Sequence, residues 1–210
     1  MGQKINPTGF RMGISKNWTS RWFAEKETYG DLAVEDVMIR KLLKKRFEMA
    51  GVKEVDIARS LNEINITVRV SKPGVVIGKG GAGVTEVQEE LKKLTKAKIS
   101  LTAEEVKTPE IEAELVAQYI SRQLKRRMPY RRIVSNALQA AMDKGAKGIK
   151  IRLAGLLSGG NSISRVETAH LGSVPSQTLR ADIDYAAVTC HQIYGTVGIK
   201  VWIYKGDIDL

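Results

Sequence analysis

Cysteine and histidine are scarce in this sequence, which has one cysteine and two histidines among its 210 residues. Cys190 has no second cysteine to pair with, so an internal disulfide and any multi-cysteine zinc or iron–sulfur site are excluded. Only His170 and His191 could add metal ligands, and no nucleophile is paired with a base. We therefore expect no metal, no cofactor, no small-molecule substrate and no enzymatic activity.

Long apolar runs are absent as well. None approaches the ~20 residues that a membrane-spanning helix needs, so we expect no membrane partner. The first six residues lack the apolar core of a signal peptide, and we therefore expect an intracellular, cytoplasmic protein.

Positive charge is abundant by contrast. Thirty-four lysines and arginines against 23 acids give a formal net charge of +11 and a sequence pI of about 9.7. This balance is typical of proteins that bind a polyanion, and nucleic acid is the favoured one. A basic surface can also serve solubility alone. An anionic membrane surface is the weaker alternative, because no segment combines clustered lysines with an amphipathic helix carrying large apolar side chains.

The chain is predicted to divide near residue 107 into two α+β domains. An irregular arm over residues 1–30 is rich in turn residues and aromatic side chains, which indicates that it packs onto its own domain or a partner. A first domain is expected over residues 31–106 and a second over residues 107–210.

The first domain is expected to contain two helices and three strands. The helix at 31–50 has a predicted apolar face of Val34, Met38, Leu42 and Met49. Two alternating segments within 52–70 predict strands, and 98–101 predicts a third. The second helix, between the last two strands, has a stripe of Val84, Val87, Leu91 and Leu94.

The second domain is expected to place two helices on a four-stranded sheet. Thr108 is the predicted cap of a helix that ends at Met128, because the residue before a proline resists helical geometry. A second helix is expected over 131–144. Strands are predicted over 149–153, 163–166, 179–190 and 196–205, with a hairpin turn at Gly159-Gly160-Asn161.

A glycine-rich loop over residues 78–83 allows two interpretations. Its letters match G-x-G-x-x-G, but the first glycine lies eight positions after Val70, too far from the strand for a dinucleotide site. A short helix, a G-x-x-G loop and a second helix instead resemble the KH domain, in which the loop clamps single-stranded nucleic acid. The candidate RNA-binding residues are Gly78, Lys79, Gly80 and Gly81, and Ile77 and Val84 are expected to anchor the flanking helices. A purely structural glycine turn remains the alternative.

Six basic residues and no acid occur between Ser121 and Arg132. The helix dipole favours cations at the end of one helix but opposes Arg131 and Arg132 at the start of the next by ~0.3–1 kcal/mol each. Phosphate, which arginine binds through two parallel hydrogen bonds, is the candidate ligand that would favour them there. A solvated basic corner is the alternative.

Several motifs spread over the chain are similar to those of one family, the bacterial small-subunit ribosomal protein S-three. They comprise the opening at residues 2–14, the loop at 73–81, Gly145 to Lys150, and the closing motifs at 179–185 and 198–206. The resemblance implies a prokaryotic-type (type II) KH domain followed by a ribosomal α+β domain.

The resemblance also implies a function. The chain would be a structural constituent of the small ribosomal subunit that binds 16S ribosomal RNA in the subunit head, beside proteins S-ten and S-fourteen. It would line the entrance channel for messenger RNA and help to grip and unwind the messenger. The implied channel residues are Lys125, Arg126, Arg127, Arg131 and Arg132. The candidate ribosomal RNA contacts are Lys4, Arg11, Arg165, Arg180 and Lys205. A nucleotide-dependent enzyme is the competing hypothesis, disfavoured by the loop spacing.

Two departures from the family pattern stand out. Ser135 occupies the position of a third cation, usually lysine, which implies a weaker grip on the messenger. Leu156 and residues 168–173 replace several cations and two aromatics of the family. Away from these segments, Asp182 and Asp184 could be a catalytic carboxylate pair, but a salt bridge to Arg180 or the orientation of an RNA-binding arginine is the favoured interpretation. Cys190 is interpreted as a buried apolar residue.

Overall fold

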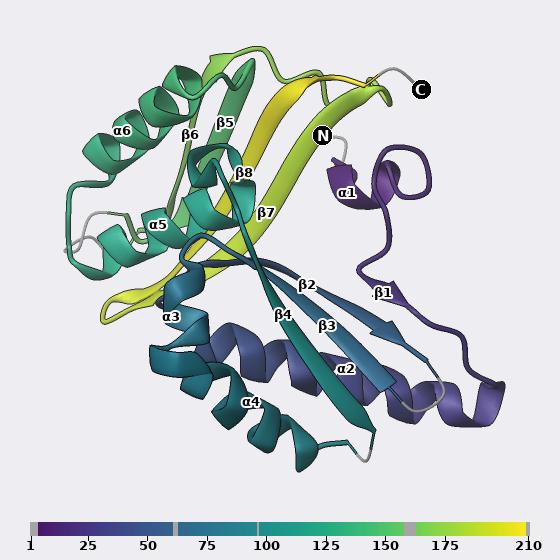
Figure 1. The fold of residues 1–210 in the computed structure, drawn as a ribbon. Helices are drawn as coiled ribbons and strands as arrows, with labels where there is room; N and C mark the ends of the chain where they lie inside the picture. Colours follow the sequence, from purple (N-terminus) through teal and green to yellow (C-terminus); the bar gives the residue numbers. More distant parts are fainter. Residues whose placement is uncertain (1–3, 61–62, 96, 158–162, 209–210) are drawn as a thin grey trace. The chain divides into compact units, whose positions relative to one another are not determined.

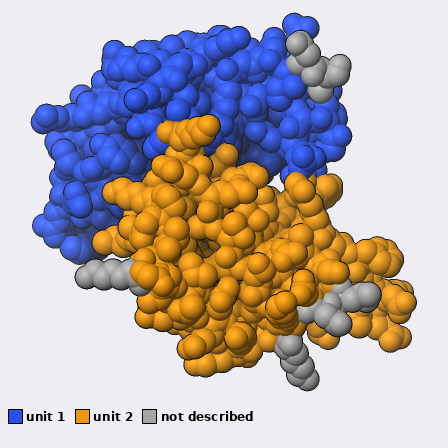
Figure 2. Space-filling model, viewed as in Figure 1, with its two compact units in different colours: residues 1–17, 108–210 blue, residues 18–107 orange. Residues whose placement is uncertain are grey.

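The computed structural model describes residues 4–60, 63–95, 97–157 and 163–208. The chain forms two compact units, one of residues 18–107 and one of residues 1–17 together with 108–210 (Figure 2). No helix among the described residues is long and apolar enough to cross a membrane. Each unit is described by itself below.

The unit of residues 18–107 is a four-stranded sheet with its helices on one face (Figure 1). Its elements are β1 (Ser20–Arg21), α2 (Lys26–Arg46), β2 (Val52–Arg59), β3 (Glu63–Val70), α3 (Pro73–Ile77), a 3-10 turn η1 (Lys79–Gly81), α4 (Ala82–Lys92) and β4 (Lys98–Glu105). The strand order is β1-β2-β3-β4, with β2 and β3 antiparallel and β4 parallel to β3. This element order confirms the KH-type arrangement expected from the sequence.

The buried face of α2 differs from the expected one. Val34, Met38 and Met49 are at least half exposed, and the residues turned toward the sheet are Asp36, Ile39, Leu43 and Phe47. Both stripes have helical spacing. The buried one escaped the sequence pattern because it includes a carboxylate, Asp36, which is only 4% exposed.

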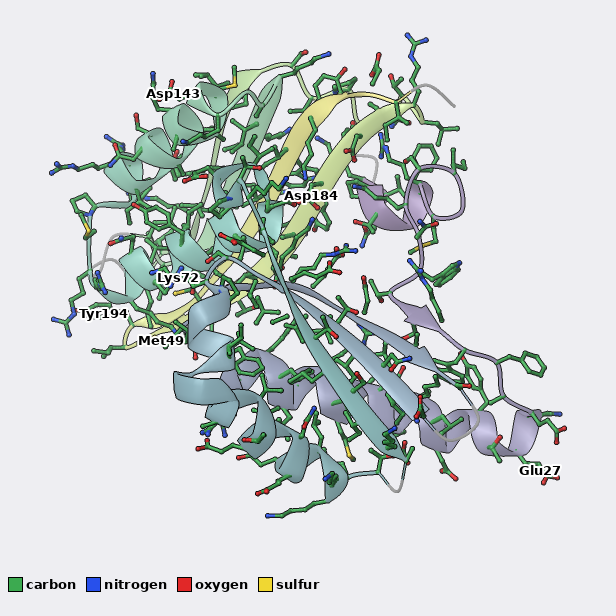
Figure 3. All side chains as sticks on the ribbon, viewed as in Figure 1. Glu27, Met49, Lys72, Asp143, Asp184 and Tyr194 are labelled. Atoms are coloured by element: carbon green, nitrogen blue, oxygen red, sulfur yellow. The ribbon has the colours of Figure 1, made fainter. Side chains whose placement is uncertain are left out.

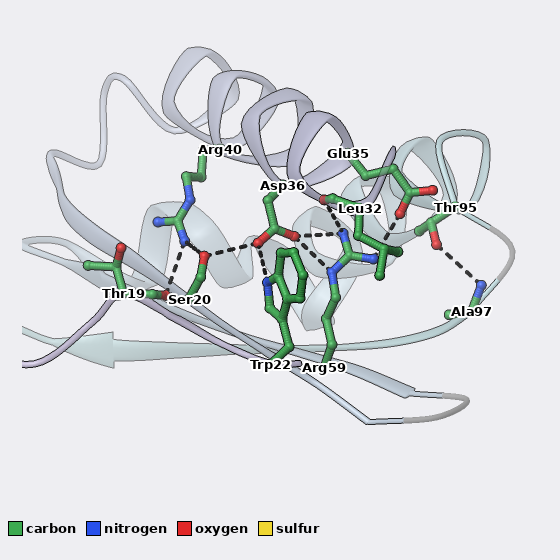
Figure 4. Close-up of polar contacts among 10 residues, drawn as sticks. All are labelled: Thr19, Ser20, Trp22, Leu32, Glu35, Asp36, Arg40, Arg59, Thr95 and Ala97. Carbon is green, nitrogen blue, oxygen red and sulfur yellow. Dashed lines mark hydrogen bonds and ion pairs between the residues drawn. The ribbon is translucent and has the colours of Figure 1, made fainter. Parts of the chain in front are cut away.

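Asp36 is buried within a network of donors (Figure 4). Its carboxylate accepts hydrogen bonds from Ser20 Oγ at 2.9 Å and from Trp22 Nε1 at 2.8 Å. Arg59 adds two more, from Nε at 2.8 Å and from one terminal nitrogen at 2.6 Å. Four donors compensate the loss of water around the charge. They also tie the segment around β1, which pairs with β2, to α2.

The unit formed by residues 1–17 and 108–210 has two helices on one face of an antiparallel sheet (Figure 1). Its elements are α1 (Pro7–Phe10), a 3-10 turn η2 (Pro109–Ile111), α5 (Ala113–Lys125), α6 (Tyr130–Asp143), β5 (Gly148–Gly155), β6 (Arg165–Gly172), β7 (Ala181–Gln192) and β8 (Gly195–Asp207). The strand order is β6-β5-β8-β7. The expected arrangement of two helices on four strands is confirmed.

The element boundaries that depart most from the sequence pattern in this unit are those of α5 and β6. Thr108 heads only the 3-10 turn, and α5 begins at Ala113, whose backbone N–H is accepted by Asp184 Oδ2 at 2.8 Å. α5 also ends at Lys125, three residues before Met128. Strand β6 runs from Arg165 to Gly172 rather than over the expected 163–166, because its whole length pairs with β5. The expected hairpin at 159–161 lies outside the described residues.

The N-terminal arm does not form one irregular piece. Residues up to 17 belong to the unit that contains residues 108–210. Residues from 18 onward belong to the unit of residues 18–107, which we call the KH unit. Arg11 explains the first attachment: its fully buried guanidinium donates to the carbonyls of Pro7, Ser176, Thr178 and Ala181 at 2.7–3.2 Å. Asp36 and its partners explain the second.

Candidate nucleic-acid interface

The G-x-x-G loop joins α3 to α4 through backbone geometry that favours glycine. Gly78, Gly80 and Gly81 have φ of +69°, +63° and +86°, values that side chains rarely adopt. At Gly83 a Cβ would lie 2.5 Å from the carbonyl oxygen of Val76, so only glycine lets α3 and α4 approach so closely. Gly78 and Gly80 are exposed, so the loop backbone is accessible next to the start of α4.

The residues around this loop partly match the expectation. Val76 is fully buried and anchors α3, whereas Ile77, expected in this role, is 44% exposed. Val84 is half-buried at the start of α4. Lys79 lies in the 3-10 turn, and its side chain lies outside the part of the chain that the structure describes.

The arginine corner lies where α5 ends and α6 begins, and comprises Lys125, Arg126, Arg127, Arg131 and Arg132. All five side chains are exposed. Over the described ranges, no acid forms an ion pair with any of its four arginines. The structure thus brings together the cations that the sequence placed on either side of Pro129.

Arg131 is oriented by its neighbours in the first turn of α6. Its Nε donates to Tyr130 Oη at 3.2 Å, and Tyr130 Oη in turn donates to Glu167 Oε1 on β6 at 3.2 Å. The hydrogen bond to Tyr130, with the nearby charge of Glu167, raises the pKa of Arg131. The guanidinium therefore stays charged at the surface. Arg132 and Ser135 are exposed beside it.

Arg127 has a backbone conformation that is uncommon outside glycine, with φ of +61°. This conformation follows the end of α5. The guanidinium of Arg127 lies 5.8 Å from the ring centroid of Tyr194. Tyr194 lies at the tip of the β7–β8 hairpin (Figure 3). A cavity of about 370 Å³ opens beside them, lined in part by Leu124 and Met128. The arginine corner therefore combines cations with an aromatic ring and apolar surface.

The structure assigns different roles to the candidate ribosomal RNA contacts. Arg11 is fully buried and holds the N-terminal segment in place. Lys205 Nζ pairs with Glu112 Oε1 at 2.7 Å and is mostly shielded from solvent. Arg180 is 66% exposed despite its contact with Asp207 at 3.5 Å, and Arg165 is exposed on β6. Lys4 is exposed and lines a groove on the sheet.

That groove was missed by the sequence analysis. It has a volume of about 720 Å³, and we call it the basic groove; its lining residues are Lys4, Ile5, Asn6, Pro7, Lys150, Arg152, Thr168, Tyr185, Lys200 and Trp202. Because successive side chains of a strand point to opposite faces, Lys150 and Arg152 on β5, and Lys200 and Trp202 on β8, point away from the apolar core. Their convergence on one spot depends on the pairing of β5 with β8, which no local pattern reveals.

Cys190, Asp182 and Asp184 all have structural contacts, although the partners of the two carboxylates differ from the expected one. Cys190 is fully buried, with its Sγ 3.4 Å from the carbonyl oxygen of Ser121. Asp182 pairs with Lys16 at 2.7 Å, and Asp184 caps α5 as described above. The expected salt bridge to Arg180 is wrong: within the described part of the chain, Arg180 pairs with Asp207 instead.

Comparison with known proteins identifies both units. Residues 38–111 match the family model described as KH domain, and residues 120–203 match that of ribosomal protein S3, C-terminal domain. The small ribosomal subunit protein uS3 of Desulforamulus reducens is 45% identical over 99% of this chain and 94% of its own length. Those of Caldanaerobacter subterraneus and Finegoldia magna are each 47% identical over 99% of this chain, covering 94% and 85% of their own lengths. The chain therefore belongs to the uS3 family of small ribosomal subunit proteins, which are structural RNA-binding components of the ribosome rather than enzymes.

Proposed function

We propose that this protein binds 16S ribosomal RNA in the head of the small subunit, beside proteins S-ten and S-fourteen, in the cytoplasm. We further propose that its arginine corner lines the channel through which messenger RNA enters and helps to grip and unwind it. The arginine corner itself carries this proposal: exposed arginines flank a helix start, and none of them forms an ion pair with an acid among the residues that the structure describes.

The charge arrangement supports a phosphate ligand at the arginine corner. Arg131 and Arg132 occupy the first turn of α6, where the helix dipole disfavours cations by about 0.3–1 kcal/mol each. Tyr130 orients Arg131 but does not neutralise it. A polyanion that approaches this corner would meet arginines already exposed and charged, which can bind phosphate through paired hydrogen bonds.

The KH loop supports binding to a sugar–phosphate backbone at a second place. Gly80 and Gly81 have no side chains to keep a ligand away, and a Cβ at either would meet no atom within 4 Å. We propose that Gly78, Lys79, Gly80 and Gly81 contact RNA there, as in other KH domains.

The experiment measures RNA affinity of the full chain over a series of salt concentrations. Changing Arg131 and Arg132 to alanine is expected to weaken binding and to flatten the log–log salt dependence by about 1.5 units, since each phosphate contact contributes roughly 0.7–0.9. The loss should be similar for different RNA sequences, because phosphate carries no sequence information. The double change Lys41→Ala and Lys45→Ala, on the exposed face of α2, removes the same charge and serves as the matched control.

The role at the channel is tested in reconstituted ribosomes. The Arg131→Ala, Arg132→Ala protein should slow translation through a structured messenger far more than through an unstructured one. Ser135→Lys should speed passage through structure, since it adds a cation one turn further along α6. Equal slowing on both messengers would assign the arginine corner to ribosomal RNA instead. The loop is tested by Lys79→Asp with Gly80→Asp, which should lower RNA affinity without unfolding the protein, because aspartate tolerates positive φ.

A further inference from the structure

The basic groove lies on the sheet formed by β5 to β8, on the face opposite to the one covered by α5 and α6. Ile149, Ile151 and Val201 point into the core under α5 and α6, so Lys150, Arg152, Lys200 and Trp202 point to the opposite face. The register places Lys150 opposite Trp202 and Arg152 opposite Lys200 on the paired strands β5 and β8. Residues 4–7 form one side of the groove.

Like charges converge in this groove without compensation. Its described lining contains four cations and no aspartate or glutamate. A smaller adjoining cavity of about 160 Å³ is lined by two of these cations, Lys4 and Lys150, and its described lining also has no acid. Arg152 and Lys200 are directly opposite each other across two strands, an arrangement that destabilises a sheet. Contact with Lys4 lowers the pKa of Lys150, with burial and the charge of Arg152 adding to the effect. A bound anion would relieve this repulsion.

Two aromatic rings form the floor of the groove next to these cations. The ring centroids of Tyr185 and Trp202 are 5.3 Å apart at an interplanar angle of 40°, and Lys150 Nζ lies 5.9 Å from the Trp202 ring. Trp202 also packs on the small cluster around Ile183 and Tyr204, which fixes the ring in place while part of its surface stays accessible. A rigid aromatic surface flanked by cations is the arrangement on which unpaired bases stack.

We infer that the basic groove binds an unpaired stretch of RNA, with a base stacked on Trp202 and its flanking phosphates held by Lys150, Arg152 and Lys200. The inference rests on the proposed RNA-binding function and adds a site and a ligand class. Duplex RNA fits less well, because its bases are already stacked and cannot reach the ring. An acidic protein segment would satisfy the cations but would leave the aromatic floor without a stacking partner.

The test follows Trp202 directly in the full chain. The indole N–H signals of the three tryptophans are recorded by NMR, and the Trp202 signal is identified with Trp202→Phe. The chain also carries Arg131→Ala and Arg132→Ala, so that the arginine corner does not contribute. A short single-stranded oligouridylate should shift the Trp202 signal, whereas a duplex of the same length should shift it far less. An unmoved Trp202 signal during single-strand binding would overturn the inference.

Two variants test the chemistry of the groove while keeping Trp202. Lys150→Gln with Lys200→Gln should weaken single-strand binding by about tenfold through the loss of two phosphate contacts. Thr168→Glu should do the same without removing a cation, because Thr168 lies opposite Arg152 and its replacement would occupy that guanidinium. Lys41→Gln with Lys45→Gln is the control of equal charge and should change affinity less than twofold.

The remaining outcomes separate this inference from the proposed function. A polyglutamate peptide that shifts the Trp202 signal as much as oligouridylate would show that the groove recognises acidic protein, and the inference would be dropped. A Trp202 response in a protein whose Arg131 and Arg132 prove irrelevant to messenger reading would leave the groove assignment standing while the channel role falls.

Discussion

At the scale of single residues, Asp36 shows how a polar group organises the KH unit. It is buried on α2 and accepts four hydrogen bonds, two of them from Arg59. Glu35 pairs with the same arginine at 2.8 Å, but its side chain is 31% exposed. The two adjacent carboxylates therefore share one partner and differ in burial.

Changing Asp36 to alanine is expected to cost about 3–5 kcal/mol of unfolding free energy, because Arg59 would remain buried with part of its charge uncompensated. Glu35→Ala is the control and should cost at most about 1 kcal/mol, as exposed ion pairs do. Hydrogen exchange of the β2 and β3 amides measures the stability of this unit. Comparable losses for the two variants would show that burial does not decide the contribution.

At the scale of elements, the start of α5 depends on charges buried against β7 and β8. Burial would raise the pKa of Asp184, but hydrogen bonds from the Ala113 amide and from Glu112, with the charges of Lys205 and Lys16, hold it below its ordinary value. Burial, with Asp184 nearby, raises the pKa of Glu112 despite its bond to Lys205. The pKa values of the two carboxyl groups are therefore shifted in opposite directions (Asp184 is labelled in Figure 3).

These directions predict opposite effects on acid stability. The native state binds the Asp184 proton more weakly than the unfolded chain, so this group stabilises above its ordinary pKa and the gain is lost as pH falls through the native pKa. The native state binds the Glu112 proton more tightly, so stability falls as pH rises from the ordinary carboxyl range through the raised pKa. Hydrogen exchange of β7 and β8 amides against pH measures both effects.

Asp184→Asn should remove the increase in stability that occurs as pH rises toward the ordinary carboxyl pKa. Glu112→Gln should remove the decrease in stability that occurs as pH rises above it. The amide of each variant keeps the shape of the carboxyl group, so packing is a minor difference between them. Identical pH profiles for the two variants would contradict the opposite shifts.

At the scale of the whole molecule, the chain is built from two units whose boundaries cut the N-terminal arm. The KH unit begins at residue 18, because Ser20 pairs with β2 and Trp22 hydrogen-bonds to Asp36. A fragment of residues 18–107 is therefore expected to fold alone.

A shorter fragment of residues 31–106 should be less stable by about 3 kcal/mol, since it lacks two donors to a buried carboxylate. Circular dichroism with urea unfolding compares the two fragments. Equal stability would show that residues 18–30 are not part of the folded unit.

Much of this architecture was predictable from the sequence. Alternation located β2, β3 and β5, glycines marked the KH loop, and the six cations between Ser121 and Arg132 indicated the arginine corner. These signals are local, so the periodicity of the chain suffices to read them. The prediction of the buried face of α2 was wrong, because two sets of residues on this helix have helical spacing. Only packing against the sheet selects the face that contains Asp36.

The sequence by itself determined the fold class, the family and the excess of positive charge, because each is written in local pattern or composition. Only the tertiary structure decided which cations are available. Arg11 donates its hydrogen bonds to four backbone carbonyls, and Lys205 forms an ion pair with Glu112. Lys150, Arg152 and Lys200, by contrast, converge beside Trp202. The physical reason is that burial and strand register bring together residues that are far apart in the chain. A count of charges along the sequence shows neither which residues are buried nor which strands are paired.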